Sequence, residues 1–456
     1  MKHIKLALFL QKFLHTSDAL IISELLNTAH DADLADALVV FNHTDVVRIL
    51  LTIPLTRRVS IFEHFNHHMQ TAVAMAMQPD ALAKLIAAMA HDERADLYNQ
   101  LPEALKRQIK PNIAADEVKD ITHLSSYPEG TAGANMTSDF LYIRADITAK
   151  EAIDLTRRYA SKKETIYYIY VIDADKKLLG VLSLRDLLLT DEQNRIQDIM
   201  RTNVISSHAN DKQASVVQKI ARYDLLSLPI IDNQARLIGI ITADDALDLQ
   251  AAQSTQTLYK TGGIEAARFE IPTSMLTNIK HASIWTLYRM RVVWLVVLVF
   301  GNVFSGAGIA HFEDMISSYV VLVFFLPLLI DSGGNAGSQA ATLMVRGLAT
   351  GEVVLKDWGK MVTKEVLVAA ALGFSMALAV ALVGFVRGGP EIALVVATSM
   401  VLIVIVGSVI GLCLPFALSK LNFDPATASA PLITSIADAV GVLIYFSIAS
   451  QVLSFN

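Results

Sequence analysis

Asp331 and Asp438 are two carboxylates that lie inside long apolar runs near the end of the chain. A charged side chain in a membrane-spanning segment is costly unless it meets water, a partner or a cation. Asp438 follows Pro431 by seven residues, about two helical turns, and Thr434 lies one turn before it on the same face. We expect Asp438, with the hydroxyl of Thr434, to hold a hydrated cation. The alternative is a neutral or helix-bonded aspartate that is buried in the helix bundle.

Asp331 is the competing intramembrane acid, and it lies beside the pair Gly333-Gly334. Small residues at this place permit either a close helix contact or a break in the backbone. Two interpretations of Asp331 stay open. It could form a second cation site, or it could pack against a polar group such as Gln339 or Asn335.

The elements that must position these acids are long apolar runs in residues 284–456. Of the 82 Asp, Glu, Lys and Arg residues in the 456-residue chain, 17 lie in this part. Each run can cross about 30 Å of hydrocarbon at about 1.5 Å per residue. We therefore predict a membrane domain of five transmembrane helices. The spans are Val292–Ala310, Met315–Val345, Val366–Val386, Ile392–Ser419 and Pro425–Leu453.

The basic residues around these spans predict the orientation of the chain. Seven of them lie before the first span, between spans two and three, or after span four, and only Arg387 lies in the opposite loops. Basic loops stay on the cytoplasmic side. We expect a multi-pass protein of the cell (inner) membrane with cytoplasmic N-terminal domains and an extracytoplasmic C-terminus. The seven residues are Arg289, Arg291, Arg346, Lys356, Lys360, Lys364 and Lys420.

Residues 126–250 contain an internal duplication. The stretch that begins Ile172-Asp173 and continues through Leu179–Asp186 recurs 59 residues later, from Ile231. Each copy has a strand that ends at a glycine, a second short strand, and a Ser or Thr that caps a helix. These α/β modules resemble a tandem pair of CBS domains, which dimerise and often bind adenine nucleotides.

The rest of the polar part is predicted to be helical. Residues 1–125 show apolar spacings of three and four and a repeated His-Asp pair, which together predict a cytoplasmic helical repeat domain. Residues 251–283 are predicted to hold a linking helix and a connector to the membrane domain at 284–456. The net charge of −6 makes nucleic acid an unlikely partner class. No nucleophile–base set is visible, so we do not expect an enzyme.

The order of these parts, together with the second span, resembles the MgtE family of magnesium channels. That span contains Pro327 and then Gly333-Gly334-Asn335, Gly337 and Gln339. The resemblance implies a homodimer in the lipid bilayer, with Asp438 of each chain facing a pore on the two-fold axis. It implies Mg²⁺ as the ion, with Co²⁺, Ni²⁺ and Mn²⁺ as further candidates.

The resemblance also implies acidic sites outside the pore. Glu365 and Asp424 would hold Mg²⁺ at the cytoplasmic mouth, and the alternative is ordinary interfacial charge. Clustered acids of the cytoplasmic domains would bind regulatory Mg²⁺ and close the pore, and the alternative for each acid is a helix cap or a solvated charge. The candidate regulatory acids are Asp92, Asp96, Asp224, Asp245 and Asp248.

This chain departs from the family pattern in its linking helix. Gln253, Gln256 and Thr257 stand where relatives carry acids, and Lys212 and Ala214 replace two further acids. A neutral amide is a weaker ligand than a carboxylate for a hard divalent cation. We therefore predict weaker or altered Mg²⁺-dependent closure with an intact pore.

A nucleotide site in the CBS pair is a second implication of the resemblance. Arg185 and Asp186 match positions that hold ribose and phosphate, and Tyr168 or Tyr170 could stack on adenine. ATP is the expected ligand, and the alternative is an empty dimerisation module. Two rivals to a channel also stay open: a coupled secondary transporter that exchanges Mg²⁺ for Na⁺, and a CBS-based membrane sensor without transport.

Overall fold

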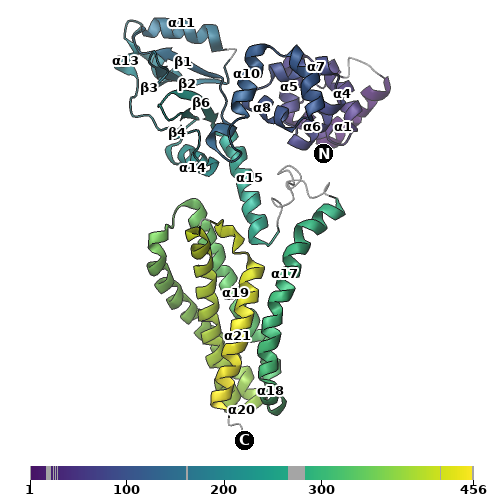
Figure 1. The fold of residues 1–456 in the computed structure, drawn as a ribbon, viewed down its shortest axis with the longest axis vertical. Helices are drawn as coiled ribbons and strands as arrows, with labels where there is room; N and C mark the ends of the chain where they lie inside the picture. Colours follow the sequence, from purple (N-terminus) through teal and green to yellow (C-terminus); the bar gives the residue numbers. More distant parts are fainter. Residues whose placement is uncertain are drawn as a thin grey trace. The chain divides into compact units, whose positions relative to one another are not determined.

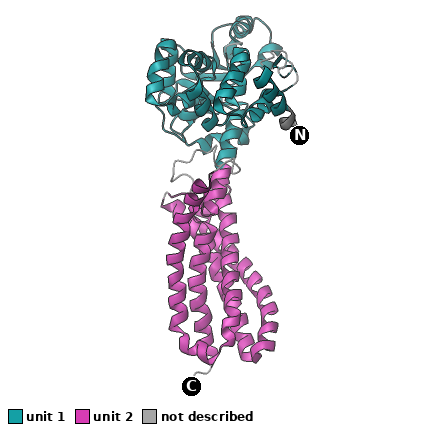
Figure 2. Cartoon of the chain, turned by 90° about the vertical axis from the view of Figure 1, so that its right-hand side faces the viewer, with its two compact units in different colours: residues 1–253 teal, residues 254–456 magenta. Residues whose placement is uncertain are grey.

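A computed structural model describes residues 2–16, 22–23, 25, 27, 29–160, 163–264, 283–421 and 423–453 of the chain. The chain forms two compact units, residues 1–253 and 254–456, which Figure 2 draws in teal and magenta. The first unit holds short helices and two small sheets, and the second holds long apolar helices (Figure 1). The division falls within helix α15 (Ala243–Thr261), which contributes residues to both units.

The first unit begins with a helical domain of regular spacing. After α1 (Lys2–Thr16), helices in the described residues start at 31, 43, 55, 67, 79, 91, 103 and 115, so consecutive starts are 12 residues apart. Each of these helices contacts the next but one along the chain, and their apolar residues share one core. The structure confirms the predicted helical repeat. The helices are α3 (Asp31–Leu38), α4 (His43–Thr52), α5 (Leu55–Glu63), α6 (His67–Ala76), α7 (Pro79–Ala88), α8 (His91–Gln100), α9 (Glu103–Ile109) and α10 (Ala115–Leu124).

Polar side chains cap several of these helices. Asn42 and Asn66 precede α4 and α6, and each accepts the backbone N–H three residues on, at 2.8 and 3.0 Å. His30 caps α3 in a similar way. Such side chains satisfy backbone donors that the first helical turn leaves unpaired. His91 of the repeated His-Asp pair lies inside α8, and its ring nitrogen Nδ1 is 2.6 Å from the hydroxyl of Ser138.

Two three-stranded sheets follow, one for each copy of the duplication. In each sheet the first two strands are parallel and the last two are antiparallel. A helix crosses between the parallel strands of each sheet, and a second helix follows its last strand, which confirms the CBS pair. The first copy contains β1 (Phe140–Arg144), α11 (Ala149–Tyr159), β2 (Thr165–Ile172), β3 (Leu178–Ser183) and α12 (Leu184–Leu189). After α13 (Ile196–Ile199), the second contains β4 (Ser207–His208), α14 (Gln213–Tyr223), β5 (Ser227–Ile231), β6 (Leu237–Thr242) and α15.

The two CBS modules exchange backbone hydrogen bonds at matching places. The N–H of Val181 donates to the carbonyl of Arg201 at 3.0 Å, and the N–H of Arg201 donates back at 2.9 Å. Thr137 and Ile240 make the equivalent pair at 2.9 and 3.0 Å. The residue before Val181 or Ile240 is glycine, because a Cβ there would lie 2.7 Å or less from a methionine sulfur of the other module.

Four helices in the described residues 283–453 are long and apolar enough to cross a membrane. One of them, α20, turns back on itself at Gly389, where φ is 79° and ψ is −173°. Gly384 faces Ala393 and Gly373 faces Val401, so the two limbs of α20 run antiparallel. The described residues therefore contain five apolar segments, as predicted. The helices are α17 (Ile284–His311), α18 (Glu313–Ser318), α19 (Val321–Thr350), α20 (Trp358–Lys420) and α21 (Ala430–Val452).

Element boundaries differ from the predicted spans in several places. The short helix α18 precedes α19, so the second span begins at Val321 and not at Met315. The last span begins at Ala430, after a 3₁₀ turn. Helix α15 begins at Ala243, inside the second CBS module, and residues 265–282 of the predicted connector lie outside the described residues. The 3₁₀ turns are Lys110–Asn112, Ala132–Asn135, Leu355–Asp357 and Pro425–Thr427.

Glycines on one face of α19 bring it into close contact with α20. Gly333 and Gly337 face Gly407 and Gly411 so closely that a Cβ on either α20 glycine would overlap a backbone oxygen of α19. Faces of small residues allow such contacts between membrane helices. The helix continues through Pro327 and the glycine pair, so the structure supports the close contact and not the backbone break.

Candidate ion pathway and acidic cluster

Asp438 lies in the middle of α21, one turn beyond Thr434, and its side chain is half-buried in the single chain. The hydroxyl of Thr434 donates to the carbonyl of Ala430 at 3.1 Å and to that of Pro431 at 2.9 Å. The hydroxyl hydrogen of Thr434 is thus donated within the helix. The hydroxyl oxygen can still accept a hydrogen bond from a water of a hydrated ion. Asp438 is the only Asp, Glu, Lys or Arg in α21.

Helices α19 and α21 lie side by side and run in opposite directions (Figure 1). A Cβ on Gly334 would lie 3.0 Å from the methyl carbon of Thr434. Farther along both helices, the hydroxyl of Tyr445 donates to the carbonyl of Leu322 at 3.0 Å. These two contacts fix the alignment of α19 against α21. The glycine-rich motif of α19 therefore lies beside the turn of α21 that carries Asp438.

Asp331 contacts Asn335, one of the two polar neighbours that were candidates for it. The side-chain amide of Asn335 donates to its Oδ2 at 2.9 Å, one helical turn away in α19. Both side chains are exposed on the single chain. An exposed charge in a membrane-spanning helix needs water or another protein surface beside it.

The two acids expected at the cytoplasmic mouth lie near the starts of their helices. Glu365 lies near the start of α20, beside Ser408 of the other limb. Asp424 caps the 3₁₀ turn before α21, where its Oδ1 accepts the N–H of Ala426 at 2.9 Å. Its Oδ2 lies 2.5 Å from Nζ of Lys260, at the end of the linking helix. Asp424 is therefore already paired with a cation of the chain.

An acidic cluster lies within the first unit, where the helical domain meets the CBS pair. Helix α8 supplies three of its carboxylates, α5 supplies one, the segment before β2 supplies one, and the start of α15 supplies one. The charges of neighbouring acids repel five of these carboxylates, and the sixth, Glu63, acts in turn on Asp92, Glu93 and Glu164. The members of this acidic cluster are Glu63, Asp92, Glu93, Asp96, Glu164 and Asp245.

The pKa values of the acidic cluster lie above their ordinary range. Burial, with the charges of neighbouring acids, raises the pKa of Asp92 and of Asp245 to about 6. Burial likewise raises the pKa of Asp96 to about 6, with a smaller effect from a nearby glutamate. The same two causes raise the pKa of Glu93 to about 8. The pKa of Glu164 is also raised, although this side chain lies at the exposed edge of the acidic cluster. A proton or a divalent cation would relieve this repulsion.

The acidic cluster shows where the predicted regulatory acids lie. Asp92, Asp96 and Asp245 belong to it. Asp224 is exposed and ends α14 in a left-handed conformation, with φ 50° and ψ 47°. Asp248 is exposed one turn beyond Asp245. The structure thus brings three of the five predicted acids together and places the other two outside the acidic cluster.

Sequence reasoning misses Glu63, Glu93 and Glu164. Glu93 adjoins Asp92, so its proximity is visible in the sequence, whereas Glu63 and Glu164 come from distant segments and reach the cluster only through the tertiary fold. One oxygen of Asp92 is buried and has no hydrogen-bond partner among the described residues. In the described part of the chain, no three His, Cys, Asp or Glu side chains are already arranged to hold a metal ion. An ion would have to draw these carboxylates together.

A hydrogen-bond network lies beside the acidic cluster and joins α8 to α10. Asp120 accepts from Arg94 at 2.6 Å and from the hydroxyl of Ser138 at 2.7 Å, and the ring of His91 lies 3.0 Å away. Burial opposes ionisation of Asp120, but these hydrogen bonds hold its pKa well below the usual range. A cleft of about 800 Å³ is lined by His91, Asp120 and Glu164, among others.

The expected nucleotide residues do not all remain accessible. Tyr170 is 1% exposed, and its hydroxyl lies 2.8 Å from that of Ser227 in the second CBS sheet. It is therefore a core residue, which corrects the expectation that its ring could stack on adenine. Asp186 pairs with Arg201 at 3.3 Å. Tyr168, Arg185 and Asp186 remain as candidates.

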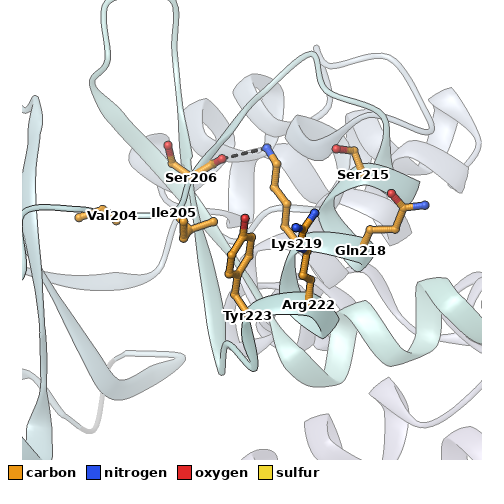
Figure 3. A pocket seen from close by; sticks show the side chains of 8 residues that line it. All are labelled: Val204, Ile205, Ser206, Ser215, Gln218, Lys219, Arg222 and Tyr223. Carbon is orange, nitrogen blue, oxygen red and sulfur yellow. Dashed lines mark hydrogen bonds between the residues drawn. The ribbon is translucent and has the colours of Figure 1, made fainter. Parts of the chain in front are cut away.

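A separate hollow of about 460 Å³ lies beside α14 (Figure 3). Its lining includes Lys219, Arg222 and Tyr223, and none of the predicted nucleotide residues. The ammonium of Lys219 donates to the carbonyl of Ser206 at 2.9 Å and also lies 3.4 Å from Asp211. The charge of Lys219 is thus compensated within the chain.

Family models match most of the chain. Residues 326–448 match the model MgtE, described as a divalent cation transporter. Residues 29–130 match the model of the MgtE intracellular N domain. Residues 132–191 and 196–252 each match the CBS domain.

Two curated relatives carry the same name. The magnesium transporter MgtE of Thermus thermophilus is 32% identical over 452 residues, which cover 98% of this chain and 99% of the relative. The magnesium transporter MgtE of Bacillus subtilis is 35% identical over 363 residues, covering 79% of this chain and 78% of that relative.

Solved structures resemble the first unit. The crystal structure of the soluble part of a magnesium transporter is 30% identical, has a TM-score of 0.52, and covers 55% of this chain and 99% of its own. The cytosolic domain of the Mg²⁺ channel MgtE in complex with ATP is also 30% identical and has a TM-score of 0.51. The match covers 53% of this chain and 99% of that chain.

Proposed function

The chain belongs to the MgtE family of magnesium transporters, and from this premise we propose that it conducts hydrated Mg²⁺ through a pore lined by α21. It is a membrane transporter and not an enzyme. The observation that carries the proposal is Asp438, a half-buried carboxylate in an otherwise uncharged transmembrane helix. An acid is retained at such a place when it serves an ion pathway.

The ion is held through its own water shell. Mg²⁺ binds its waters tightly and gives them up reluctantly. The carboxylate oxygens of Asp438 accept hydrogen bonds from these waters, and the Thr434 oxygen accepts a further one. Contact through water keeps the attraction moderate, which lets the ion leave again.

The working unit is a homodimer in which two copies of Asp438 face one axis. A single chain exposes Asp331 and Asn335 on its surface at membrane depth, where lipid would leave their polar groups unsatisfied. A second copy that encloses a water-filled pore would satisfy them. Two Asp438 carboxylates then provide a charge of −2 for one divalent ion.

Mg²⁺ moves inward through this pore. A membrane that is negative inside favours entry of a divalent cation by about 4.6 kcal/mol per 100 mV, twice the value for one charge. The basic loops support a cytoplasmic first unit and an extracytoplasmic C-terminus. The membrane is the inner membrane of the cell.

The acidic cluster acts as the cytoplasmic sensor of this channel. When internal Mg²⁺ is low, the carboxylates of Asp92, Asp96 and Asp245 repel one another. A bound Mg²⁺ ion removes this repulsion and stabilises the arrangement in which the helical domain and the CBS pair lie together. Asp245 lies in the first turn of α15 and Lys260 in its last turn, so ion binding at one end of α15 is coupled to the other end. Asp224 and Asp248 act as secondary, solvent-exposed sites.

Mg²⁺ control at the cytoplasmic mouth is weaker than in acid-rich relatives. Gln253, Gln256 and Thr257 of α15 provide no charge, and Lys260 neutralises Asp424 directly. An ammonium that already occupies the carboxylate competes with a divalent cation for the same oxygen atoms. Glu365 is the mouth acid that has no paired cation among the described residues, and it lies beside Ser408.

ATP binds the CBS pair through Tyr168, Arg185 and Asp186. Its binding changes how strongly internal Mg²⁺ closes the pore. An ATP complex of a related cytosolic domain supports the ligand class. The loss of Tyr170 as a stacking ring, and Leu225 and Leu226 in place of an aromatic, predict weaker adenine binding than in a site with two aromatic faces.

Reconstituted Mg²⁺ uptake tests the proposed function. Liposomes that contain the full chain and a Mg²⁺-sensitive dye should show uptake that follows the Mg²⁺ gradient without Na⁺. Asp438→Asn, which keeps the size of the side chain, should reduce this uptake at least tenfold. Dependence on a Na⁺ gradient would favour the exchanger, and no uptake by the unsubstituted chain would favour the sensor.

A further inference from the structure

We propose that Asp331 is a second charge of the same ion pathway, which faces the ion together with Asp438 and sets how strongly the pathway attracts divalent cations. This inference rests on the proposed function, because it assumes that Asp438 faces the ion. It means that α19 attracts the ion directly through Asp331. The glycine-rich face of α19 serves only helix packing.

The register of α19 against α21 places the two acids at one depth. Gly334 and Thr434 are in contact, and the helices are antiparallel. Asp331 lies three residues from Gly334, about 4.5 Å along the axis, and Asp438 lies four residues from Thr434, about 6 Å in the same direction. The two carboxylates therefore differ in depth by only about 1.5 Å.

The same geometry turns both acids toward one side of the helix pair. With about 100° per residue, Asp331 is rotated about 60° from the Gly334 contact, and Asp438 about 40° from the Thr434 contact. Because both helices are right-handed and run in opposite directions, these two rotations lead to the same side.

The side that carries both acids is not the side that α20 covers. Helix α20 packs on α19 through Gly333 and Gly337, which lie on the opposite face of α19. Asp331 is exposed and Asp438 is half-buried on the single chain. A lipid-facing carboxylate would be costly, so water or a second copy of the chain lies on this side.

Asn335 positions the Asp331 carboxylate. Its amide donates to Oδ2 at 2.9 Å, and no hydrogen bond from the described residues reaches Oδ1. A neutral amide orients the carboxylate without cancelling its charge, unlike the lysine that pairs with Asp424. The free oxygen of Asp331 can thus accept a hydrogen bond from a water of the hydrated ion.

Asp331→Asn tests this inference in the reconstituted full chain. In the proposed homodimer, Asp331→Asn removes two unit charges from the pathway, one from each chain. Loss of one charge at about 6 Å from a divalent ion, in water-like surroundings, weakens attraction about tenfold, so loss of both weakens it about a hundredfold. The external Mg²⁺ concentration for half-maximal uptake should therefore rise about a hundredfold, and Asp331→Glu should restore most of it. Ser332→Ala is the matched control, because the Ser332 hydroxyl donates to its own helix at Leu328, 2.6 Å away.

The outcomes separate this inference from the proposed function. If the unsubstituted chain takes up no Mg²⁺, the proposed function fails. If it does, and Asp331→Asn leaves the half-maximal concentration within twofold, the inference is overturned while the channel stands. If Asp331→Asn does not give monodisperse protein, Asp331→Glu and Asp331→Gln form the charged and neutral pair, and equal half-maximal concentrations for these two would overturn it.

Discussion

Nζ of Lys260 lies 2.5 Å from Oδ2 of Asp424, so an ion pair joins the last turn of α15 to the turn that precedes α21. The two side chains are 29% and 45% exposed. A pair this accessible stabilises by about 1 kcal/mol or less. The pair matters because of where it lies. The ammonium of Lys260 binds the carboxylate of Asp424, which would otherwise be free to bind a divalent cation.

Replacement of Lys260 should change how the pore responds to internal Mg²⁺. Lys260→Glu leaves two carboxylates facing each other, which repel until a divalent cation bridges them. We expect flux to become more strongly dependent on internal Mg²⁺, with the half-closing concentration shifted at least threefold. Uptake into liposomes loaded with graded Mg²⁺ measures this. Lys260→Gln removes the pair without adding an acid, and an equal shift in both variants would contradict the bridging explanation.

The acidic cluster should make the first unit more stable at lower pH when Mg²⁺ is absent. The folded-state pKa values of Asp92, Asp96 and Asp245, about 6, exceed the ordinary value of about 3.9. The folded chain therefore binds more protons than the unfolded chain, so its stability falls as pH rises through about 6. Hydrogen exchange of the α8 amides, corrected for intrinsic rates, should be slower at pH 5.5 than at pH 7.5.

Saturating Mg²⁺ should remove most of this pH effect, because the ion replaces the protons. Glu93→Gln provides a second check, since it removes one repelling charge and should slow exchange at pH 7.5 without Mg²⁺. Exchange of α8 that is independent of both pH and Mg²⁺ would mean that the carboxylates do not interact as described.

Loss of Asp120 should strongly destabilise the first unit. Arg94 is 3% exposed and pairs with Asp120 at 2.6 Å. Removal of one partner leaves a buried charge uncompensated, which costs about 3–5 kcal/mol. Urea unfolding of Asp120→Ala, followed by circular dichroism, measures the loss. Glu103→Ala, which removes an exposed pair with Lys106, should cost about 1 kcal/mol or less.

Two glycine substitutions should have opposite effects in the membrane domain. A Cβ at Gly411 would overlap the carbonyl oxygen of Gly337, so Gly411→Ala should force α19 and α20 apart and lower the thermal unfolding temperature. A Cβ at Gly301 in α17 meets nothing within 4 Å, so Gly301→Ala should be neutral or stabilise by about 0.5–1 kcal/mol. Equal unfolding temperatures for the two variants would contradict this packing.

The order of the elements could be predicted because each has a local sequence signal. Uncharged runs of about twenty residues identify the spans, and the repeated strand–glycine–strand pattern identifies both CBS modules. The turn at Gly389 is also local, since a glycine before Pro390 ends one apolar run and begins the next. The structure confirms these elements with shifted boundaries, except that Gly180 and Gly239 lie inside the single strands β3 and β6 and do not end a strand.

The contacts among distant segments could not be predicted. The acidic cluster needs Glu63, Glu164 and α8 to meet, and nothing in the spacing of those residues fixes that meeting. The burial of Tyr170 depends on Ser227 from the second module. The 12-residue spacing of the helix starts was present in the sequence, but the helix-capping residues that mark it differ from one helix to the next.

That spacing limits how the helical domain can vary in length. A deletion of one full period would leave each later helix in the position its predecessor held, with its apolar stripe still turned inward. A deletion of any other size would rotate every following helix and bring polar residues into the interior. Natural variants of this domain should therefore grow or shrink by whole helices, and the distance between its ends should change in equal steps.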